Sequence, residues 1–335
     1  MHRSDRLAVG LALVLAACAH DVTSPEPTLS AASPDLVCNG AAGSSADGRT
    51  AVTLTGTHFT PMPSNVLAEP TRLLLPRVTL TPRAAIPGGA LATAPIELAD
   101  DPAAPAASRV RWTSETEMGF DVVPADALAT GIFDVTVTNP DGSSAASIAQ
   151  AFAVIPPPIV AGLAPPAICD DQDDQTVTIT GANFLVYADH APSVTIGVGA
   201  GAHTYAATAA AADCAPLGGD LVEADAALCT AITITIPVGD FVVTAATDLP
   251  LVVTNPAPAD CASSSSPITI RIEPPPRVDA VVPATVCQGG STLTVTGANF
   301  LPDAVVELHC GAVVVTAATV TVVPDGTQLS ASFGG

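Results

Sequence analysis

Residues 177–186 read VTITGANFLV, and this phrase decides the fold because the chain contains it three times. The other copies are VTLTGTHFTP at residues 52–61 and LTVTGANFLP at residues 293–302. In each copy an apolar residue alternates with threonine up to a glycine, which predicts a half-buried strand that ends in a bend. A phrase repeated at long intervals indicates one kind of domain copied along the chain. We therefore expect small β-domains in tandem.

Two further segments recur around this phrase. Before each copy, an apolar-x-x-apolar-x-Pro segment ends at Pro34, Pro165 or Pro283, and a cysteine stands four residues after each proline. After the first two copies, Val-Thr-Asn-Pro occurs at residues 137–140 and 253–256. Asn-Pro after a β-branched run predicts a strand that runs into a turn. The repeat is thus a whole domain and not an isolated motif.

The order of these segments resembles the IPT/TIG family of immunoglobulin-like domains. The Thr-Gly-Ala-Asn-Phe bend and the Val-Thr-Asn-Pro turn are the most specific parts of the resemblance, which covers most of residues 29–335. It implies an all-β chain of tandem immunoglobulin-like β-sandwiches. The family shares no catalytic residue, so none is carried over. The copies are longer than a minimal sandwich, so we expect loop insertions near residues 61–109 and 187–230.

The repeat also predicts how the chain is divided. Runs of three prolines at residues 156–158 and 274–276 favour extended, semi-rigid linkers. We expect a signal peptide at 1–17, a lipidated cysteine with a flexible tether at 18–33, and sandwiches at 34–157, 158–275 and 276–335. Residues 329–333 match the strand expected at 232–236, and no final hairpin follows them. We expect the third sandwich to be incomplete or the native chain to continue beyond this point.

The N-terminus predicts export and a lipid anchor. Arg3 and Arg6 precede a short apolar run over residues 7–17, as in a secretory signal that is too short to span a bilayer. The run ends in Leu-Ala-Ala-Cys, which resembles the bacterial lipoprotein box, so Cys18 is the expected site of acylation. Ordinary cleavage after Ala19 is the alternative. Without an aspartate after the cysteine, the resemblance favours the outer membrane or the cell surface.

The composition fits an exported β-protein. The formal net charge is -22, and all ten basic residues are arginine. Such a charge repels phosphate backbones, so we expect no nucleic-acid partner. The expected partners are the membrane, through the lipid, and a protein or glycan at the surface. The apolar content of 48% is enough for packed cores, although only 3% of the residues are aromatic.

Cysteines are expected to form disulfides in an oxidising compartment. The second copy contains Cys169, Cys214, Cys229 and Cys261, which allow three pairings. We favour Cys214 with Cys229, because they flank one inserted loop. Cys169 would then pair with Cys261 and join the start of the domain to its late turn.

The other cysteines are harder to assign. In the third copy, Cys287 and Cys310 are candidates for a pair. Cys38 has no partner within its own domain. Reduced, buried cysteines are the alternative for all of these positions, and a metal site is disfavoured because the chain has no Cys-x-x-Cys motif.

No catalytic motif is evident, and no cofactor is expected. The sharpest candidate is the acidic run Asp170, Asp171, Asp173 and Asp174, since clustered carboxylates bind Ca²⁺. The run lacks the spacing and glycine of an EF-hand loop, so a solvated acidic loop is the favoured interpretation. His58 stands where the other copies have asparagine, which predicts a turn residue.

The aromatic residues are the remaining candidates for ligand binding. Trp112, Tyr187 and Tyr205 lie outside the repeated core pattern, and exposed aromatic faces commonly bind sugars. Packing at the end of a sandwich is the favoured interpretation of both tyrosines.

Two functions remain open. The first is a non-enzymatic, membrane-anchored bacterial surface lipoprotein whose repeats act as spacer, adhesion or protein-interaction modules. The second is the stalk of an extracellular hydrolase whose catalytic domain lies beyond residue 335.

Overall fold

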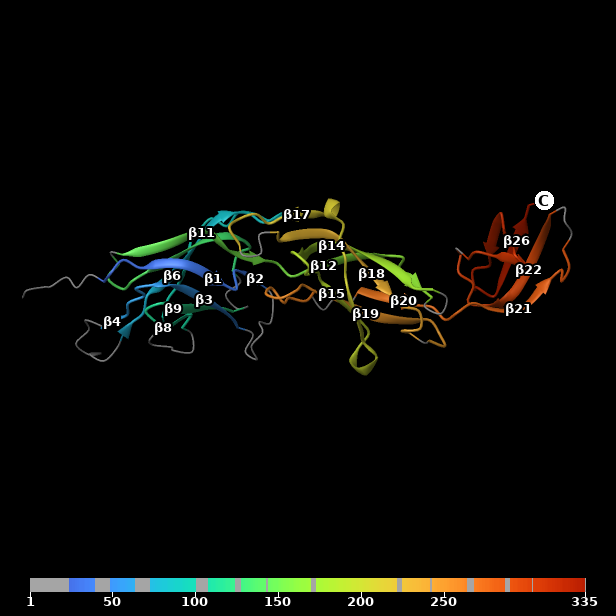
Figure 1. Cartoon of the computed structure of the whole chain (residues 1–335). Coiled ribbons are helices and arrows are strands. Elements are labelled where there is room, and N and C mark those ends of the chain that lie inside the picture. Colours follow the sequence, from blue (N-terminus) through green and yellow to red (C-terminus); the bar gives the residue numbers. More distant parts are fainter. Residues whose placement is uncertain are drawn as a thin grey trace, which may run out of the picture.

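The computed structural model describes most of the chain. The described residues are 24–39, 49–63, 73–100, 108–123, 128–142, 144–169, 173–221, 225–241, 243–263, 268–286, 290–302 and 304–334. They form an all-β structure in which pairs of sheets follow one another along an elongated molecule (Figure 1). We name the described parts of 24–155, 159–272 and 277–334 the first, second and third units.

The first unit stacks two sheets. One has the strand order β1 (Thr28–Ser33), β3 (Thr50–Thr57), β9 (Glu117–Val122) and β8 (Val110–Ser114). The other has the order β2 (Leu36–Cys38), β11 (Ala145–Ile155), β10 (Gly131–Thr138), β6 (Arg77–Ala84) and β7 (Ile96–Leu98). The short strands β4 (Met62–Pro63) and β5 (Leu73–Leu74) pair separately. Buried residues of both large sheets share one apolar core, as in a β-sandwich.

The second unit repeats this order. One sheet has the order β12 (Ile159–Ala164), β14 (Gln175–Val186), β18 (Ala227–Ile236) and β17 (Cys214–Pro216). The other has the order β13 (Ala167–Ile168), β20 (Ile268–Ile272), β19 (Thr247–Thr254), β15 (Ser193–Ile196) and β16 (His203–Ala206). Two short 3-10 helices, η3 (Gly199–Gly201) and η4 (Ala211–Asp213), connect strands of the unit.

The third unit has one full sheet and one short one. The full sheet has the order β21 (Arg277–Val282), β22 (Ser291–Ala298), β26 (Gln328–Phe333) and β25 (Thr319–Val322). The short one is a pair, β23 (Glu307–Cys310) and β24 (Val313–Thr316). β26 pairs with β22 in the register that β18 has with β14, which confirms the expected match of residues 329–333 with 232–236.

The repeated phrase forms the central strands β3, β14 and β22 and the bend that follows. The phenylalanine after each bend is buried, with Phe184 fully enclosed. The glycine of the bend needs its small size: a Cβ on Gly181 would overlap the carbonyl oxygen of Ile159 on the paired strand. The left-handed conformation falls two residues later, at Asn183 (φ 64°) and at the matching His58 (φ 59°). The turn role predicted for His58 is confirmed.

The tether predicted at residues 18–33 is wrong for its described part. Residues 28–33 form β1, which pairs with β3, and Leu29 packs against the core of the first unit. The pairing of β1 with β3 shifts register between Leu29 and Ala31, so Leu29 and Ala32, three residues apart, both reach the core.

The segments expected to be loop insertions contain strands of the sandwiches. Residues 61–109 contain β6 and β7, and residues 187–230 contain β15, β16 and β17, all of which belong to the large sheets. β6 alternates buried and exposed positions like the other strands, but its sequence carries no copy of the repeated phrase. In each of the first two units the region therefore supplies two strands of the five-stranded sheet where the sequence predicted a loop.

Candidate functional site

One apolar cluster belongs to neither sandwich core and lies between the first two units. The first unit contributes Leu36, Cys38, Ile86, Ile132, Ala153 and Ile155. The second contributes Leu185, Tyr187, Leu217, Leu221, Ala226, Leu228, Ala259 and Cys261. All of these side chains are buried. We call this cluster the joint; Figure 1 shows the two units that it connects end to end.

A disulfide between Cys38 and Cys261 crosses the joint, with the Cα atoms 6.0 Å apart. The pairing predicted for Cys169 with Cys261 is therefore wrong. The predicted bond between Cys214 and Cys229 is confirmed, and these residues face each other on β17 and β18. Sequence reasoning missed Cys38 because it sought a partner inside each copy, whereas this cysteine reaches the next one.

Local structure fixes both ends of the interdomain disulfide. Cys38 ends β2, which pairs in parallel with β11 and so lies at the end of the first unit. Cys261 ends the turn after β19, where its carbonyl oxygen accepts the Asn255 N–H at 2.8 Å. A backbone hydrogen bond from the Asp220 N–H to the Gln150 carbonyl, 3.2 Å long, also crosses between the units.

The asparagine of Val-Thr-Asn-Pro holds this turn against the repeated bend. Asn255 is 1% exposed, and its Oδ1 accepts the Leu185 N–H at 2.9 Å while its Nδ2 donates to the Asn183 carbonyl at 2.9 Å. In the first unit Asn139 does the same, accepting the Thr60 N–H at 3.2 Å and donating to the His58 carbonyl at 3.0 Å. The two repeated motifs are thus joined in both units by hydrogen bonds between the asparagine of the turn and the backbone of the bend.

The corresponding turn of the first unit also contacts the segment that precedes β1. The Ser24 N–H and hydroxyl both donate to the Asp141 carboxylate at 2.8 Å, and the Ser24 and Ser144 hydroxyls lie 3.1 Å apart. In both units, therefore, the Asn-Pro turn is bonded to a residue from an earlier part of the chain: to Ser24 in the first unit and to Cys38 in the second.

The other predicted cysteines are not at the joint. Cys18 and Cys287 lie outside the described residues. Cys169 is half-buried, Cys310 is exposed, and neither forms a disulfide with a described residue.

The acidic run does not form a metal site in the part that is described. Asp174 accepts the Val238 N–H at 3.0 Å and so holds a loop, and the Asp173 carbonyl accepts the Gln175 side-chain amide at 2.9 Å. Asp170 and Asp171 lie outside the described residues. Among the residues that the structure describes, no group of three or more His, Cys, Asp or Glu side chains is arranged to hold a metal ion.

The aromatic candidates have packing roles. Tyr187 is 8% exposed and belongs to the joint, with its ring centroid 4.8 Å from that of His190. Tyr205 packs in the core of the second unit, and its hydroxyl donates to Asp240 at 2.9 Å. Trp112 is partly exposed, and its indole donates to the Phe59 carbonyl at 2.7 Å. The favoured interpretation of the two tyrosines is confirmed.

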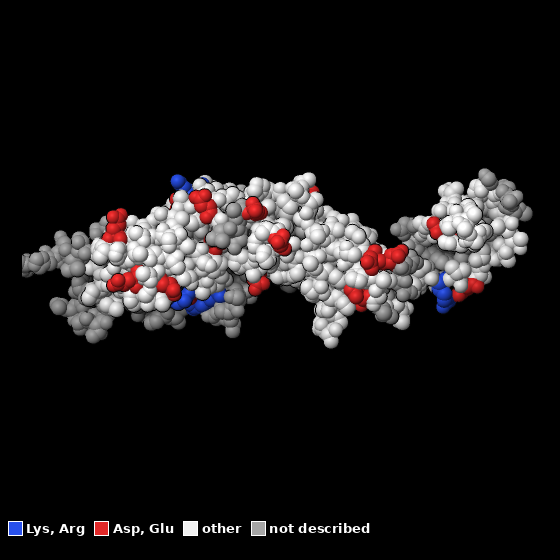
Figure 2. All heavy atoms as spheres, in the orientation of Figure 1, with Lys and Arg blue, Asp and Glu red and all other residues white. Residues whose placement is uncertain are grey.

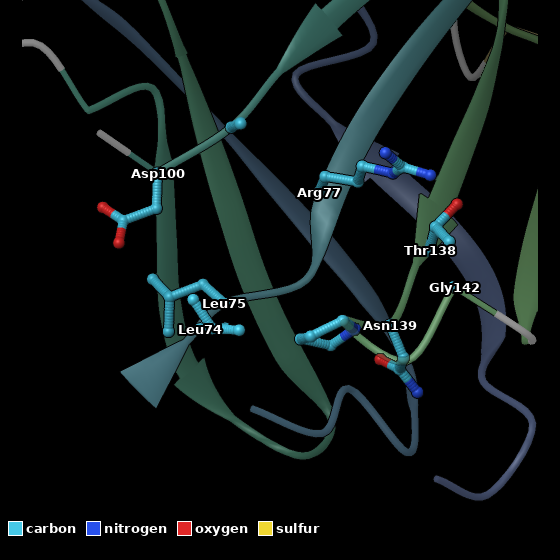
Figure 3. Close-up of a pocket in the computed structure, with 9 residues that line it drawn as sticks. Leu74, Leu75, Arg77, Asp100, Thr138, Asn139 and Gly142 are labelled. Atoms are coloured by element: carbon cyan, nitrogen blue, oxygen red, sulfur yellow. The ribbon is translucent and has the colours of Figure 1, made fainter. Parts of the chain in front are cut away.

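A surface hollow of about 390 Å³ lies at the other end of the first unit and is lined by Leu74, Leu75, Arg77, Ala99, Asp100, Thr138, Asn139, Pro140 and Gly142. Figure 3 shows Arg77 and Asp100 on different sides of it, with their charged ends pointing apart. Asp100 accepts the Ser108 hydroxyl at 2.8 Å, and the Asn139 amide is used by the bend. The hollow thus lacks a convergent set of reactive groups.

Charged groups are dispersed on the face drawn in Figure 2, where acidic side chains occur singly or in small groups. Asp121 is a buried exception, and it pairs with Arg49 at 3.3 Å and Arg111 at 3.0 Å. These pairs neutralise a carboxylate inside the first unit, which is a structural role.

Comparisons with known proteins assign no function. No family profile matches the chain, and neither does any curated protein. A solved structure titled as a crystal structure with a xylogluco-oligosaccharide is similar over 93% of this chain and 55% of its own, with 14% identity and a TM-score of 0.31. The chain thus spans about half of that protein, and a likeness of this degree carries no functional argument.

Two observations bear on location. The two disulfides indicate an extracellular or periplasmic protein. No helix in the described ranges is long and apolar enough to cross a membrane.

Proposed function

We propose that the chain is a non-enzymatic spacer: a row of immunoglobulin-like domains of the IPT/TIG kind, held to a bacterial membrane by an acylated Cys18. The observation that carries the proposal is the joint. Domains in one chain usually move relative to each other unless the interface is large and apolar. Here fourteen buried residues and an interdomain disulfide connect the first two units.

Two polar side chains of the second unit support the same role. The side-chain amide of Asn255 is bonded, and the hydroxyl of Tyr205 is engaged inside its own unit. Side chains that a binding or catalytic site would present to solvent are thus used here for packing. A stiff pair of units separates what lies at its two ends, which is the mechanical property that a spacer requires.

Small-angle X-ray scattering of the Cys18→Ser chain tests the stiffness. We expect a pair-distance distribution that one fixed arrangement of the first two units reproduces. Tyr187→Asp combined with Cys261→Ser places a charge in the joint and removes its disulfide, and should broaden the distribution. Tyr205→Phe is the matched control, since it changes a tyrosine outside the joint. If the Cys18→Ser chain without further changes scattered as two independently moving units, the spacer proposal would be wrong.

Fatty-acid labelling in a bacterial host tests the anchor. The unaltered chain should incorporate the label and partition with membranes, and Cys18→Ser should do neither. Equal labelling of both proteins would contradict the anchor but not the stiffness of the joint.

A further inference from the structure

The chain before β1 is bonded to the first unit at three successive residues. The Ser24 N–H donates to the Asp141 carboxylate at 2.8 Å. The Pro25 carbonyl accepts the Asn139 side-chain amide at 3.3 Å. The carbonyl of the next residue lies 3.1 Å from Nδ1 of His58. Ser24 is therefore held on the first unit, ahead of β1.

These contacts lie at the end of the first unit that is opposite the joint. β11 begins at Ala145, directly after the turn that contains Ser144, and runs along the unit to Ile155 in the joint (Figure 1). A strand rises ~3.3 Å per residue, so the eleven residues of β11 separate the two ends by about 35 Å. We call the described residues 58–60, 139–142 and 144 the outer end.

The outer end is polar at positions where the second unit is apolar. The Thr60 N–H donates to the side-chain oxygen of Asn139, as the Leu185 N–H does to that of the matching asparagine in the second unit. The carbonyls of Ser144 and Cys261 accept the backbone N–H of the same two asparagines. The joint thus uses Leu185 and Cys261, and the outer end has hydroxyl groups in their places. A polar end face suits hydrated surroundings better than packing against another domain.

The lipid anchor would hold this end close to a membrane. Cys18 precedes Ser24 by six residues. A fully extended chain spans at most ~3.6 Å per residue, so covalent geometry alone keeps Ser24 within about 22 Å of the acylated residue. Because Ser24 is bonded to the Asn-Pro turn, the same limit applies to the outer end. This step rests on the acylation of Cys18 that is proposed above.

We propose that the outer end is a membrane-facing surface that contacts zwitterionic lipid headgroups, and that the row of units stands away from the membrane from there. Hydroxyl, amide and carbonyl groups of this end can bond to the headgroups directly or through water. Glu26 beside it is exposed, and the formal net charge of the chain is -22, so anionic headgroups are disfavoured. The ammonium group of phosphatidylethanolamine, in contrast, donates hydrogen bonds to such a surface.

The chain contains a natural reporter of this contact. Trp112 is its only tryptophan and is 36% exposed. The indole donates to the Phe59 carbonyl at 2.7 Å. Phe59 lies between His58 and Thr60, whose backbone groups both bond to the Asn139 side chain. Tryptophan fluorescence of the unaltered chain therefore reports on the outer end.

The test measures energy transfer from tryptophan to a lipid headgroup. The acylated chain is purified from a bacterial host and added to preformed vesicles of phosphatidylethanolamine and phosphatidylcholine that contain a small fraction of headgroup-dansylated lipid. We expect strong transfer from Trp112, because transfer falls steeply with distance. Adding anionic phosphatidylglycerol should not increase it.

A second reporter position distinguishes a standing row from one that lies flat on the membrane. Val198 is 74% exposed and follows β15, whose Ser193 pairs near the joint with Thr254 while Ile196 lies farther from it. The chain that combines Trp112→Phe with Val198→Trp should show at least tenfold less transfer. Equal transfer from the two positions would overturn the proposal.

The length of the tether is varied separately. Twenty Gly/Ser residues inserted between Ala19 and His20 add a root-mean-square reach of about 25 Å, and should lower transfer from Trp112 at least threefold. The same insert after Gly335 is the control and should leave transfer unchanged.

Mass spectrometry of each protein separates the two proposals. A chain without acyl groups would contradict the anchor, and this inference would fall with it. An acylated, vesicle-bound chain that shows no transfer from Trp112, or whose transfer does not respond to the longer tether, would overturn the membrane-facing surface alone.

Discussion

Replacing Gly181 by alanine tests whether the repeated bend depends on close backbone approach. Gly181 lies on β14 opposite Val160 of β12. An added Cβ would overlap the carbonyl oxygen of Ile159 and also meet the ring of Phe184. The first of these is a backbone atom, so rotation of a side chain cannot relieve the clash. Either β12 must separate from β14 here, or the bend must shift.

The expected magnitude follows from two opposing effects. Glycine to alanine stabilises a protein by about 0.4–1 kcal/mol where the backbone accepts it, because the unfolded chain loses freedom. Forcing an extra methyl group into packed structure costs about 1–3 kcal/mol, and more where backbone must move. We expect the clash to dominate, with a net loss of about 2 kcal/mol. Since ~1.4 kcal/mol is tenfold, amides of β14 should exchange about 30-fold faster.

Hydrogen exchange with mass spectrometry on the full chain measures this change in residues 175–186. Gly162→Ala is the matched control on the paired strand, because its Cβ would meet only the Thr180 hydroxyl, at 3.3 Å. We expect that control to leave stability unchanged or to raise it by up to about 1 kcal/mol, because the backbone accepts alanine there. If both variants exchanged at the same rate, the requirement for glycine would have another cause and the reasoning from close approach would fail.

Three further changes probe the same unit. Asn255→Ala should lower the free energy of unfolding by about 3 kcal/mol, because the Leu185 N–H and the Asn183 carbonyl lose their buried partner; urea unfolding followed by circular dichroism measures it. Phe184→Ala should cost about 3–5 kcal/mol by leaving a cavity, and an unchanged midpoint would contradict its place in the core. Cys214→Ser should cost about 3 kcal/mol by opening a disulfide with a sequence separation of 15, read as faster exchange in residues 203–216.

The repeated phrase was sufficient to predict the all-β fold and its central strands. Alternation of apolar residues with threonine reports directly on which face of a strand is buried, so β3, β14 and β22 follow from the sequence. The strands β6 and β15 do not, because they lack a copied phrase and were assigned to insertions. Their place in the sheet is set by pairing with β10 and β19, which are remote in sequence.

The bend shows how a correct motif can have an incomplete physical explanation. Glycine and asparagine are both typical of left-handed backbone, so their sequence cannot say which of the two adopts it. The structure gives the positive φ to Asn183 and the close approach to Gly181. The motif therefore needs both residues for different reasons, and His58 satisfies the first requirement in the first unit.

The sequence contains a pattern that predicts the interdomain disulfide. Cys38, Cys169 and Cys287 each follow a proline by four residues, so the repeat predicts equivalent roles for them. The first copy has no other cysteine to serve as a partner, which argues that this position bonds outside its own copy. Pairing by proximity within the second copy ignored that argument and led to the wrong partner for Cys261.

The two ends of the second unit explain why a row of similar domains need not be uniformly stiff. Its end toward the first unit presents Leu185, Tyr187 and Leu228 to an apolar joint. Its end toward the third presents the Arg271–Glu273 ion pair and continues into a run of three prolines. Apolar burial resists bending in proportion to the area removed from water, whereas exposed ion pairs contribute little. The copies therefore share one fold, while the few residues on each end face decide which neighbours move together.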